Sequence, residues 1–305
     1  MAAAVAAIVA AAVLAVVTGC GAPRPTGGPG AGSVVPGRAA DPSGRYVALG
    51  DSYAAGPGVP TLTGNPVGCG RSTGNYPTQV QAVAHYAQFR DVTCSGATTA
   101  QMSRTQTTRA GSNPPQLDAV TPDTTLVTLT VGGNDIGFSD IVAHCLSTAS
   151  AGRQAATSAP CRSYYTAGGR DVLTARIDDA AADVTAVARR IRQRAPAATL
   201  LVVGYPSLLP PRNGCVEAPL SAGDLAYVDQ VTRALNSMLR GVADHAGGVY
   251  VDTAASSAGH DICAPPGVRW IEGRHPVAPA APFHPNALGM RNTADQVLRA
   301  LHLIP

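Results

Sequence analysis

Short apolar segments that alternate with amphipathic ones constrain the fold of this 305-residue chain more than any other feature. The apolar segments have the β-branched composition of buried strands, and amphipathic segments with helical spacing separate most of them. The predicted strands lie at residues 46–49, 89–94, 125–131, 199–203 and 249–252. The predicted helices lie at residues 76–87, 171–194, 222–245 and 287–301. Strands joined through helices need crossover connections, so the pattern predicts an α/β domain with a mostly parallel five-stranded sheet covered on both faces.

One domain over residues 45–305 accommodates this pattern, because α/β domains of about 260 residues are common. Three stretches lack a clear periodicity: residues 53–75, 145–168 and 253–283. We expect them to be long functional loops, and each contains cysteines that could fix it in place.

The N-terminus begins with an uninterrupted apolar run over residues 2–17, followed by Thr18, Gly19 and Cys20. The run is shorter than the roughly 20 residues of a membrane-spanning helix, so it indicates an export signal over residues 1–20. No basic residue precedes the run, unlike in most such signals. The sequence VTGC resembles the lipobox of bacterial lipoproteins, which implies lipidation at Cys20. An ordinary cleaved signal or an uncleaved anchor is the alternative.

The Gly- and Pro-rich residues 21–44 are predicted to be a flexible linker. Beyond Cys20 the chain has six cysteines, and an even number behind an export signal favours disulfides. Spacing alone does not choose among the 15 pairings that six cysteines allow. We expect neighbours to pair because they close short loops: Cys69–Cys94, Cys145–Cys161 and Cys215–Cys263. A zinc site is the weaker alternative, because no CxxC or HxxxH spacing occurs.

The charge composition excludes several classes of function. The formal net charge is only +3, which gives no electrostatic case for a nucleic-acid partner. All the basic residues other than His are Arg, so the chain has no lysine for Schiff-base or phosphate-loop chemistry.

Residues that can carry chemistry follow the predicted strands. Ser52 follows the first strand, Gly96 the second and Asn134 the third, while His284 stands before the last helix. Ligands of open α/β sheets bind at the carboxyl ends of the strands, so we expect these four residues to meet. A serine hydroxyl becomes a strong nucleophile when an imidazole takes its proton. The N–H groups of Ser52 and Gly96 and the Asn134 amide can stabilise the resulting oxyanion.

The motifs GDSY at residues 50–53, Gly96, GGND at residues 132–135 and HPN at residues 284–286 resemble the four blocks of the SGNH (GDSL-type) hydrolase family. The six-cysteine layout is similar to that of the secreted lipases and esterases of actinomycetes in this family, which have three disulfides. The resemblance implies a three-layer α/β/α sandwich of the flavodoxin-like kind with a five-stranded parallel sheet.

The resemblance also implies Ser52 as the nucleophile, His284 as the base, and Ser52, Gly96 and Asn134 as the oxyanion hole. We interpret Asp51 and Asp135 as structural residues of the same motifs.

One departure from the family pattern concerns the group that orients the histidine. The family commonly places an Asp three residues before the histidine, and here that residue is Ala281. Some members resemble this chain and use a main-chain carbonyl instead, so we expect the carbonyl of Ala281 or Pro282 to orient His284. Asp252 and Asp261 are the alternatives.

The sequence therefore predicts a secreted or lipid-anchored serine esterase or lipase that acts through an acyl-enzyme on Ser52. The expected partner is an ester substrate, a lipid or an acylated small molecule or glycan. We expect a monomer that needs no cofactor or metal, binds no nucleic acid, and is held at the outer face of the membrane only through Cys20. The alternatives are a catalytically silent lipoprotein that binds glycan or lipid, and an acyltransferase that uses the same acyl-enzyme.

Overall fold

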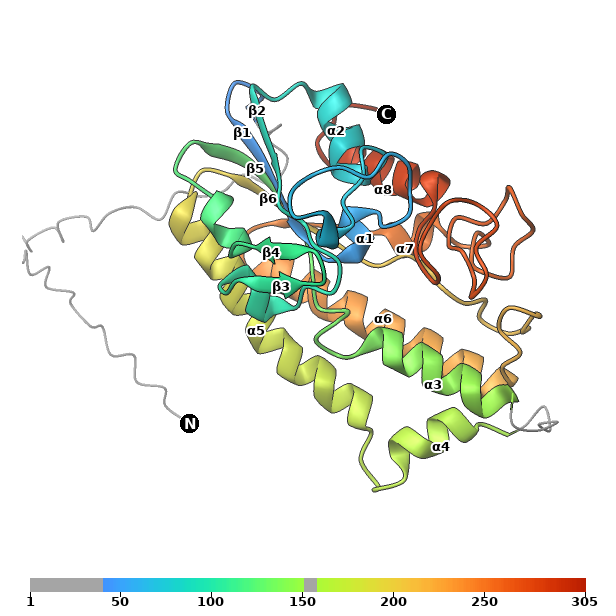
Figure 1. The fold of residues 1–305 in the computed structure, drawn as a ribbon. Helices are drawn as coiled ribbons and strands as arrows, with labels where there is room; N and C mark the ends of the chain where they lie inside the picture. The colour runs from blue at the N-terminus through green and yellow to red at the C-terminus, as the bar shows by residue number, and fades with distance from the viewer. Residues whose placement is uncertain (1–40, 151–157) are drawn as a thin grey trace, which may run out of the picture. The chain divides into compact units, whose positions relative to one another are not determined.

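The computed structural model describes residues 41–150 and 158–305, and its centre is a five-stranded parallel sheet (Figure 1). The strands run in the order β2-β1-β5-β6-β7, and every neighbouring pair is parallel. Their bounds are β1 Arg45–Gly50, β2 Gln88–Asp91, β5 Thr124–Thr130, β6 Thr199–Val203 and β7 Val249–Val251. This is the flavodoxin-like strand order, so the predicted fold class is confirmed.

Successive strand residues point to opposite faces of the sheet and enter two separate cores. In β1, Val47 and Leu49 belong to one core, whereas Tyr46 and Ala48 belong to the other. Helices α2 (Tyr76–Ala84) and α8 (Ala287–Ala300) cover the second face. Helices α5 (Val172–Arg194) and α6 (Ala222–His245) cover the first face, and α3 (Phe138–Ser150) and α4 (Pro160–Thr166) complete that layer (Figure 1).

The long elements agree with the sequence pattern because local capping groups define their ends. Strand β6 and helix α6 have the predicted bounds. Helix α5 begins after Asp171, whose carboxylate accepts from the N–H groups of Leu173 and Thr174.

Two predicted ends were wrong by three residues, whereas the other predicted bounds of these strands and helices agree within one residue. Helix α2 ends at Ala84 because His85 takes a left-handed conformation with a φ of 52°. Strand β2 ends at Asp91, earlier than predicted, because the Asp91 carboxylate turns the chain by accepting from the N–H and hydroxyl of Thr93.

The prediction of a loop over residues 145–168 was also wrong for the part of this range that the structure describes. Helix α3 continues to Ser150, and residues 160–166 form α4. The sequence of this region is rich in Ala, Ser and Thr, so its helical periodicity is weak.

Short elements that the sequence did not predict are α1 Ser52–Ala55, α7 Thr253–Ser256, the hairpin β3 Gln106–Thr108 and β4 Gly111–Asn113, and the 3₁₀ turns η1 Val67–Cys69, η2 Thr99–Met102 and η3 Gln116–Ala119.

Three disulfides join the neighbouring cysteines that the sequence analysis paired. They are Cys69–Cys94, Cys145–Cys161 and Cys215–Cys263. The first fixes the segment after β2 to the loop after α1, and the second joins α3 to α4. Each disulfide therefore restrains a segment outside the sheet.

The predicted export signal, Cys20 and most of the predicted linker lie outside the described residues. Within the described part of the chain, none of the helices is both long enough and apolar enough to cross a bilayer. At the end of the predicted linker, the carbonyls of Pro42 and Gly44 accept from the N–H groups of Ala87 and Gln88.

Candidate active site

Ser52 opens α1 directly after the carboxyl end of β1. The preceding Gly50 is held by a buried amide, because Gln116 accepts from its N–H and donates to its carbonyl. Asp51 caps α1 through the N–H of Tyr53, and its own N–H donates to the carbonyl of Thr130 on β5. The main chain on either side of the Ser52 hydroxyl is therefore fixed.

The side chains of Ser52 and His284 meet, although 232 residues separate them along the chain. Their Oγ and Nε2 atoms are 2.8 Å apart, and the other ring nitrogen, Nδ1, lies 2.7 Å from the carbonyl oxygen of Pro282. A carbonyl oxygen can only accept, so the ring proton resides on Nδ1. This tautomer leaves Nε2 free to accept the proton of Ser52.

The other groups considered for orienting His284 have different partners. The carbonyl of Ala281 accepts from the backbone N–H of His284, not from its ring. Asp252 accepts from Arg240 and caps α7, while Asp261 accepts from the N–H of Cys263. Of the candidates from the sequence, the Pro282 carbonyl is the one hydrogen-bonded to the imidazole ring.

The loops after β2 and β5 bring Gly96 and Asn134 together. The Asn134 Nδ2 donates to the carbonyl of Ala97 at 2.9 Å, which leaves its second amide hydrogen available. Within residues 41–150 and 158–305, the N–H groups of Ser52 and Gly96 have no hydrogen-bond acceptor. Such unpaired N–H groups are what an oxyanion requires.

Asp135 and the first disulfide position these donors. The Asp135 carboxylate accepts from the N–H of Thr99 at 3.0 Å and from its hydroxyl at 2.5 Å, which ties the Gly96 loop to the Asn134 loop. On the other side of Gly96, the Ser95 N–H donates to the carbonyl of Cys69, and Cys69 is bonded to Cys94. Asp135 thus has the structural role that the sequence analysis gave it.

Tyr205 is a site residue that the sequence analysis missed. Its hydroxyl donates to Asp51 Oδ2 at 2.5 Å and accepts from the N–H of Gly133 at 2.9 Å, so it links the serine loop to the asparagine loop. Tyr205 lies two residues beyond the carboxyl end of β6. Its position just after a strand is the signal that could have found it, but the predicted site residues all lie beyond the other four strands.

Tyr53 is the second missed residue, although it belongs to the GDSY motif. Its hydroxyl donates to the carbonyl of Phe283 at 2.8 Å, and its ring centroid is 5.2 Å from that of His284. Phe283 has a φ of 62°, a left-handed conformation that aromatic residues rarely adopt. The Tyr53 hydroxyl therefore holds this unusual turn, and with it the histidine, beside the serine.

Burial shifts the pKa values of two groups near the pair. Burial raises the pKa of Asp51 to about 7, although hydrogen bonds from Tyr205 and from the N–H of Tyr53 oppose the shift. Burial lowers the pKa of His284 below its ordinary value of 6.5, and the hydrogen bond to Pro282 offsets part of this change. The imidazole is therefore neutral at neutral pH, as a general base must be.

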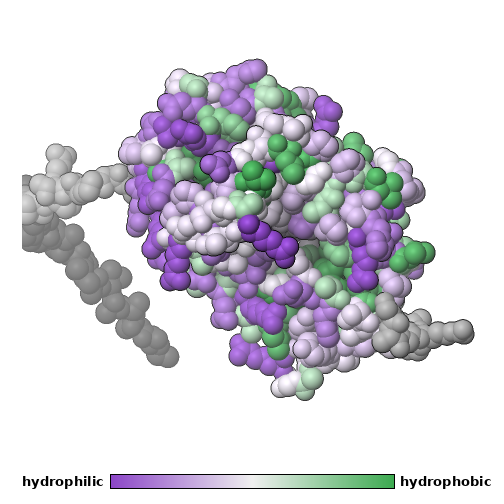
Figure 2. Space-filling model, in the orientation of Figure 1, coloured by the Kyte–Doolittle hydropathy of each residue, from purple (hydrophilic) through white to green (hydrophobic). Residues whose placement is uncertain are grey.

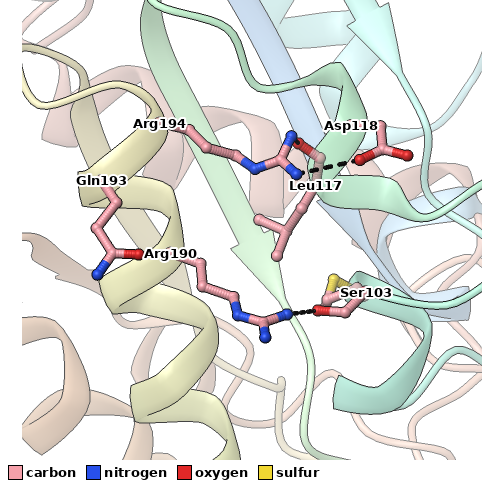
Figure 3. A pocket seen from close by; sticks show the side chains of 7 residues that line it. Ser103, Leu117, Asp118, Arg190, Gln193 and Arg194 are labelled. Carbon is pink, nitrogen blue, oxygen red and sulfur yellow. Dashed lines mark hydrogen bonds and ion pairs between the residues drawn. The ribbon is translucent and has the colours of Figure 1, made fainter.

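A separate cavity of about 340 Å³ lies between η2, η3 and α5, and neither Ser52 nor His284 lines it (Figure 3). Its arginines already have partners: Arg190 donates to Ser103, and Arg194 pairs with Asp118. Among the residues that the structure describes, no group of three or more His, Cys, Asp or Glu side chains could hold a metal ion.

A parallel α/β sheet with a Ser–His pair at its carboxyl edge places this chain in a class of hydrolases. The chain belongs to the GDSL-like lipase/acylhydrolase family, whose model matches residues 48–291. The family resemblance drawn from the four motifs is thus confirmed, and the protein is a carboxylic ester hydrolase.

Curated relatives are similar over most of their length. Lipase 2 of Streptomyces coelicolor is 38% identical over 270 residues, which cover 87% of this chain and 88% of the relative. A lipase of Streptomyces rimosus is 33% identical over 247 residues, which cover 80% of this chain and 81% of the relative.

Two solved structures are similar in fold, and both are 28% identical to this chain. Phospholipase A1 from Streptomyces albidoflavus NA297 has a TM-score of 0.66, with 85% of this chain and 99% of that chain covered. The extracellular lipase from Streptomyces rimosus has a TM-score of 0.65, with 84% and 99% covered.

Proposed function

We propose that the protein is a serine esterase or lipase that cleaves carboxylic esters through an acyl-enzyme on Ser52. The observation that carries the proposal is the 2.8 Å contact between Ser52 Oγ and the Nε2 of a neutral His284. A catalytically silent binding protein would have no need of a hydroxyl poised against an unprotonated imidazole. This contact therefore favours catalysis over the silent alternative.

In the first half-reaction, Ser52 Oγ bonds to the ester carbonyl carbon while His284 Nε2 takes the hydroxyl proton. The carbonyl oxygen becomes an oxyanion, which accepts from the N–H groups of Ser52 and Gly96 and from the amide of Asn134. When the tetrahedral intermediate collapses, the C–O bond to the alcohol breaks, and His284 returns the proton to the leaving oxygen.

In the second half-reaction, a water molecule attacks the acyl carbon and His284 takes one of its protons. Collapse of this second intermediate releases the carboxylic acid and restores the Ser52 hydroxyl. Throughout, the Pro282 carbonyl accepts the Nδ1 proton and stabilises the imidazolium, although less strongly than a carboxylate would.

We also propose that the protein acts outside the cytoplasm, exported by residues 1–20 and anchored through Cys20. Three disulfides support an oxidising compartment. The similarity to the extracellular lipase of Streptomyces rimosus supports the same location. Mass spectrometry of the exported protein tests the anchor, since a diacylglycerol adduct on Cys20 is expected, and an unmodified N-terminus there would exclude it.

A fluorophosphonate probe tests the acyl-enzyme directly, because such probes react with activated serines. We expect one covalent adduct per chain, on the peptide that contains Ser52, and loss of turnover of a chromogenic short-chain ester in step with labelling. Turnover that persists after complete labelling of Ser52 would contradict the proposal. Unchanged turnover in the presence of a chelator is the matching expectation for a reaction without a metal.

The pH dependence of kcat/KM provides a second test. His284 must be neutral to act as a base, and its folded-state pKa lies below 6.5. Activity should therefore fall as the pH passes through the lowered pKa of His284, so the midpoint of the acid limb should lie below pH 6.5. An acid limb centred above pH 6.5 on a short-chain ester would contradict this assignment.

A further inference from the structure

An apolar segment directly precedes His284. Residues 276–283 read PVAPAAPF, eight consecutive positions without a polar side chain. Several of these residues are nevertheless exposed to solvent, and Val277 is 66% exposed. A contiguous exposed apolar surface on a soluble domain commonly marks a site of interaction.

Backbone hydrogen bonds hold this segment in place. The N–H of Ala281 donates to the carbonyl of Pro57, just beyond α1, at 2.8 Å. The N–H of Val277 donates at 2.8 Å to a carboxylate oxygen of Glu272, a residue only 1% exposed. Both ends of the segment are thus tied to buried or ordered groups, which fixes the course of its main chain.

Two further exposed apolar side chains lie near the segment. Val216 is 95% exposed in the turn between Cys215 and Ala218, and the Cys215–Cys263 disulfide fixes that turn. The carboxylate of Glu217 covers Gly273, which places this turn beside the segment. On the other side of His284, Leu288 in the first turn of α8 is 43% exposed.

We call Val216, residues 276–283 and Leu288 the apolar rim. Hydrophobic side chains stand out at the right-hand edge of the face in Figure 2, the side on which the orange and red loops lie in Figure 1. The rim borders the Ser52–His284 pair, because Phe283 lies beside Tyr53 and His284 follows at once. A partner seated on the rim would therefore face the catalytic pair.

The charges around the rim are complementary to a phospholipid surface. Arg274 and His275 are exposed at the start of the segment, and residues 274–284 include no acidic residue. The nearest acidic side chains are Glu217, which is only partly exposed and lies against Gly273, and the buried Glu272, so Arg274 is the fully ionised group that faces solvent at this end of the rim. Arginine binds phosphate oxygens well, while valine, proline and leucine side chains partition into the acyl region. This arrangement of cationic and apolar groups matches the boundary between headgroups and acyl chains.

We propose that the apolar rim docks the enzyme onto the surface of a phospholipid aggregate and so presents esters in that surface to Ser52. The inference rests on the proposed function, because it assigns the same site a substrate held in an interface. It does not require that soluble esters be excluded, since these reach Ser52 without contacting the rim.

The test compares vesicle binding with soluble turnover in exported chains that carry Cys20→Ser, so that no acyl anchor contributes. The variants are Val216→Asn, Val277→Asn and the pair together. Burial of one valine side chain is worth about a factor of ten in partition, so we expect phosphatidylcholine vesicle binding to fall about tenfold for each and about a hundredfold for the pair. Turnover of a soluble short-chain ester should stay within about twofold, which also shows that the variants fold.

Val172→Asn is the matched control, because Val172 is 43% exposed at the start of α5, outside the rim. It should leave vesicle binding unchanged, and Val216→Leu with Val277→Leu should retain binding. Vesicle binding that is absent in the parent, or unchanged in the double Asn variant, would overturn the inference. A double variant that loses self-association instead of vesicle binding would also overturn it, by making the rim an interface between copies. Absence of soluble turnover in the parent would instead refute the proposed function.

Discussion

Ser52→Ala is expected to lower kcat for ester hydrolysis by about four to six orders of magnitude, the loss seen when a serine hydrolase loses its nucleophile. In the proposed mechanism Ser52 Oγ is the atom that bonds to the substrate, and no other hydroxyl is hydrogen-bonded to His284 among the described residues. The measurement is steady-state turnover of a chromogenic short-chain ester with purified protein. The variant should keep its melting temperature within a few degrees, because the change removes one oxygen from a small side chain at the start of a short helix.

Ser163→Ala serves as the control, because Ser163 is an exposed serine on α4. It should retain full activity. A Ser52→Ala enzyme that keeps more than about a hundredth of the parent kcat would exclude a covalent role for Ser52, since the remaining oxyanion donors supply only a small residual rate.

His284→Gln is expected to lower kcat by about four or more orders of magnitude, because the serine loses its proton acceptor. Glutamine fills similar space but cannot accept a proton near neutral pH. The acid limb of the pH profile should disappear together with the activity, because that limb reports protonation of His284. Fluorescence of Trp270, the single tryptophan, whose carbonyl accepts from the N–H of Asn286, can verify that the histidine loop remains folded.

Asp252→Asn and Asp261→Asn provide the comparison for the histidine variant. Both carboxylates bond to groups other than His284, so each change should leave kcat within a few-fold of the parent. A loss of a thousandfold or more in either variant would mean that a side-chain acid completes a triad. That result would contradict orientation by the Pro282 carbonyl.

The sequence predicts the fold accurately where apolar residues recur with the period of a helix or form a continuous apolar strand. β5, β6, α5 and α6 each bury an uninterrupted apolar stripe, so their positions could be predicted to within one or two residues. The short elements could not, because polar side chains decide them. Asp91 ends β2 through its own hydrogen bonds to Thr93, which no hydrophobic pattern reveals.

The site was partly predictable for a related reason. Ser52, Asn134 and His284 could be found because topology brings the segments beyond parallel strands to one edge. Tyr53 and Tyr205 act through single hydroxyl groups whose partners lie 230 and 154 residues away. Whether these hydroxyls meet their partners depends on the direction of each side chain and the path of each loop. Neither can be predicted from the spacing of residues in the sequence.

The hydrogen bond from His284 to the Pro282 carbonyl limits which mutations can remove the support of the imidazole. A peptide oxygen carries no proton to lose or gain in the physiological range, so the support of the imidazole is the same in acid and in base. No single side-chain replacement can delete it either, since every amino acid brings the same oxygen. Only an altered course of the main chain, through the left-handed turn at Phe283, can withdraw it. We therefore expect replacements of residue 282 to keep this hydrogen bond as long as the main chain keeps its course.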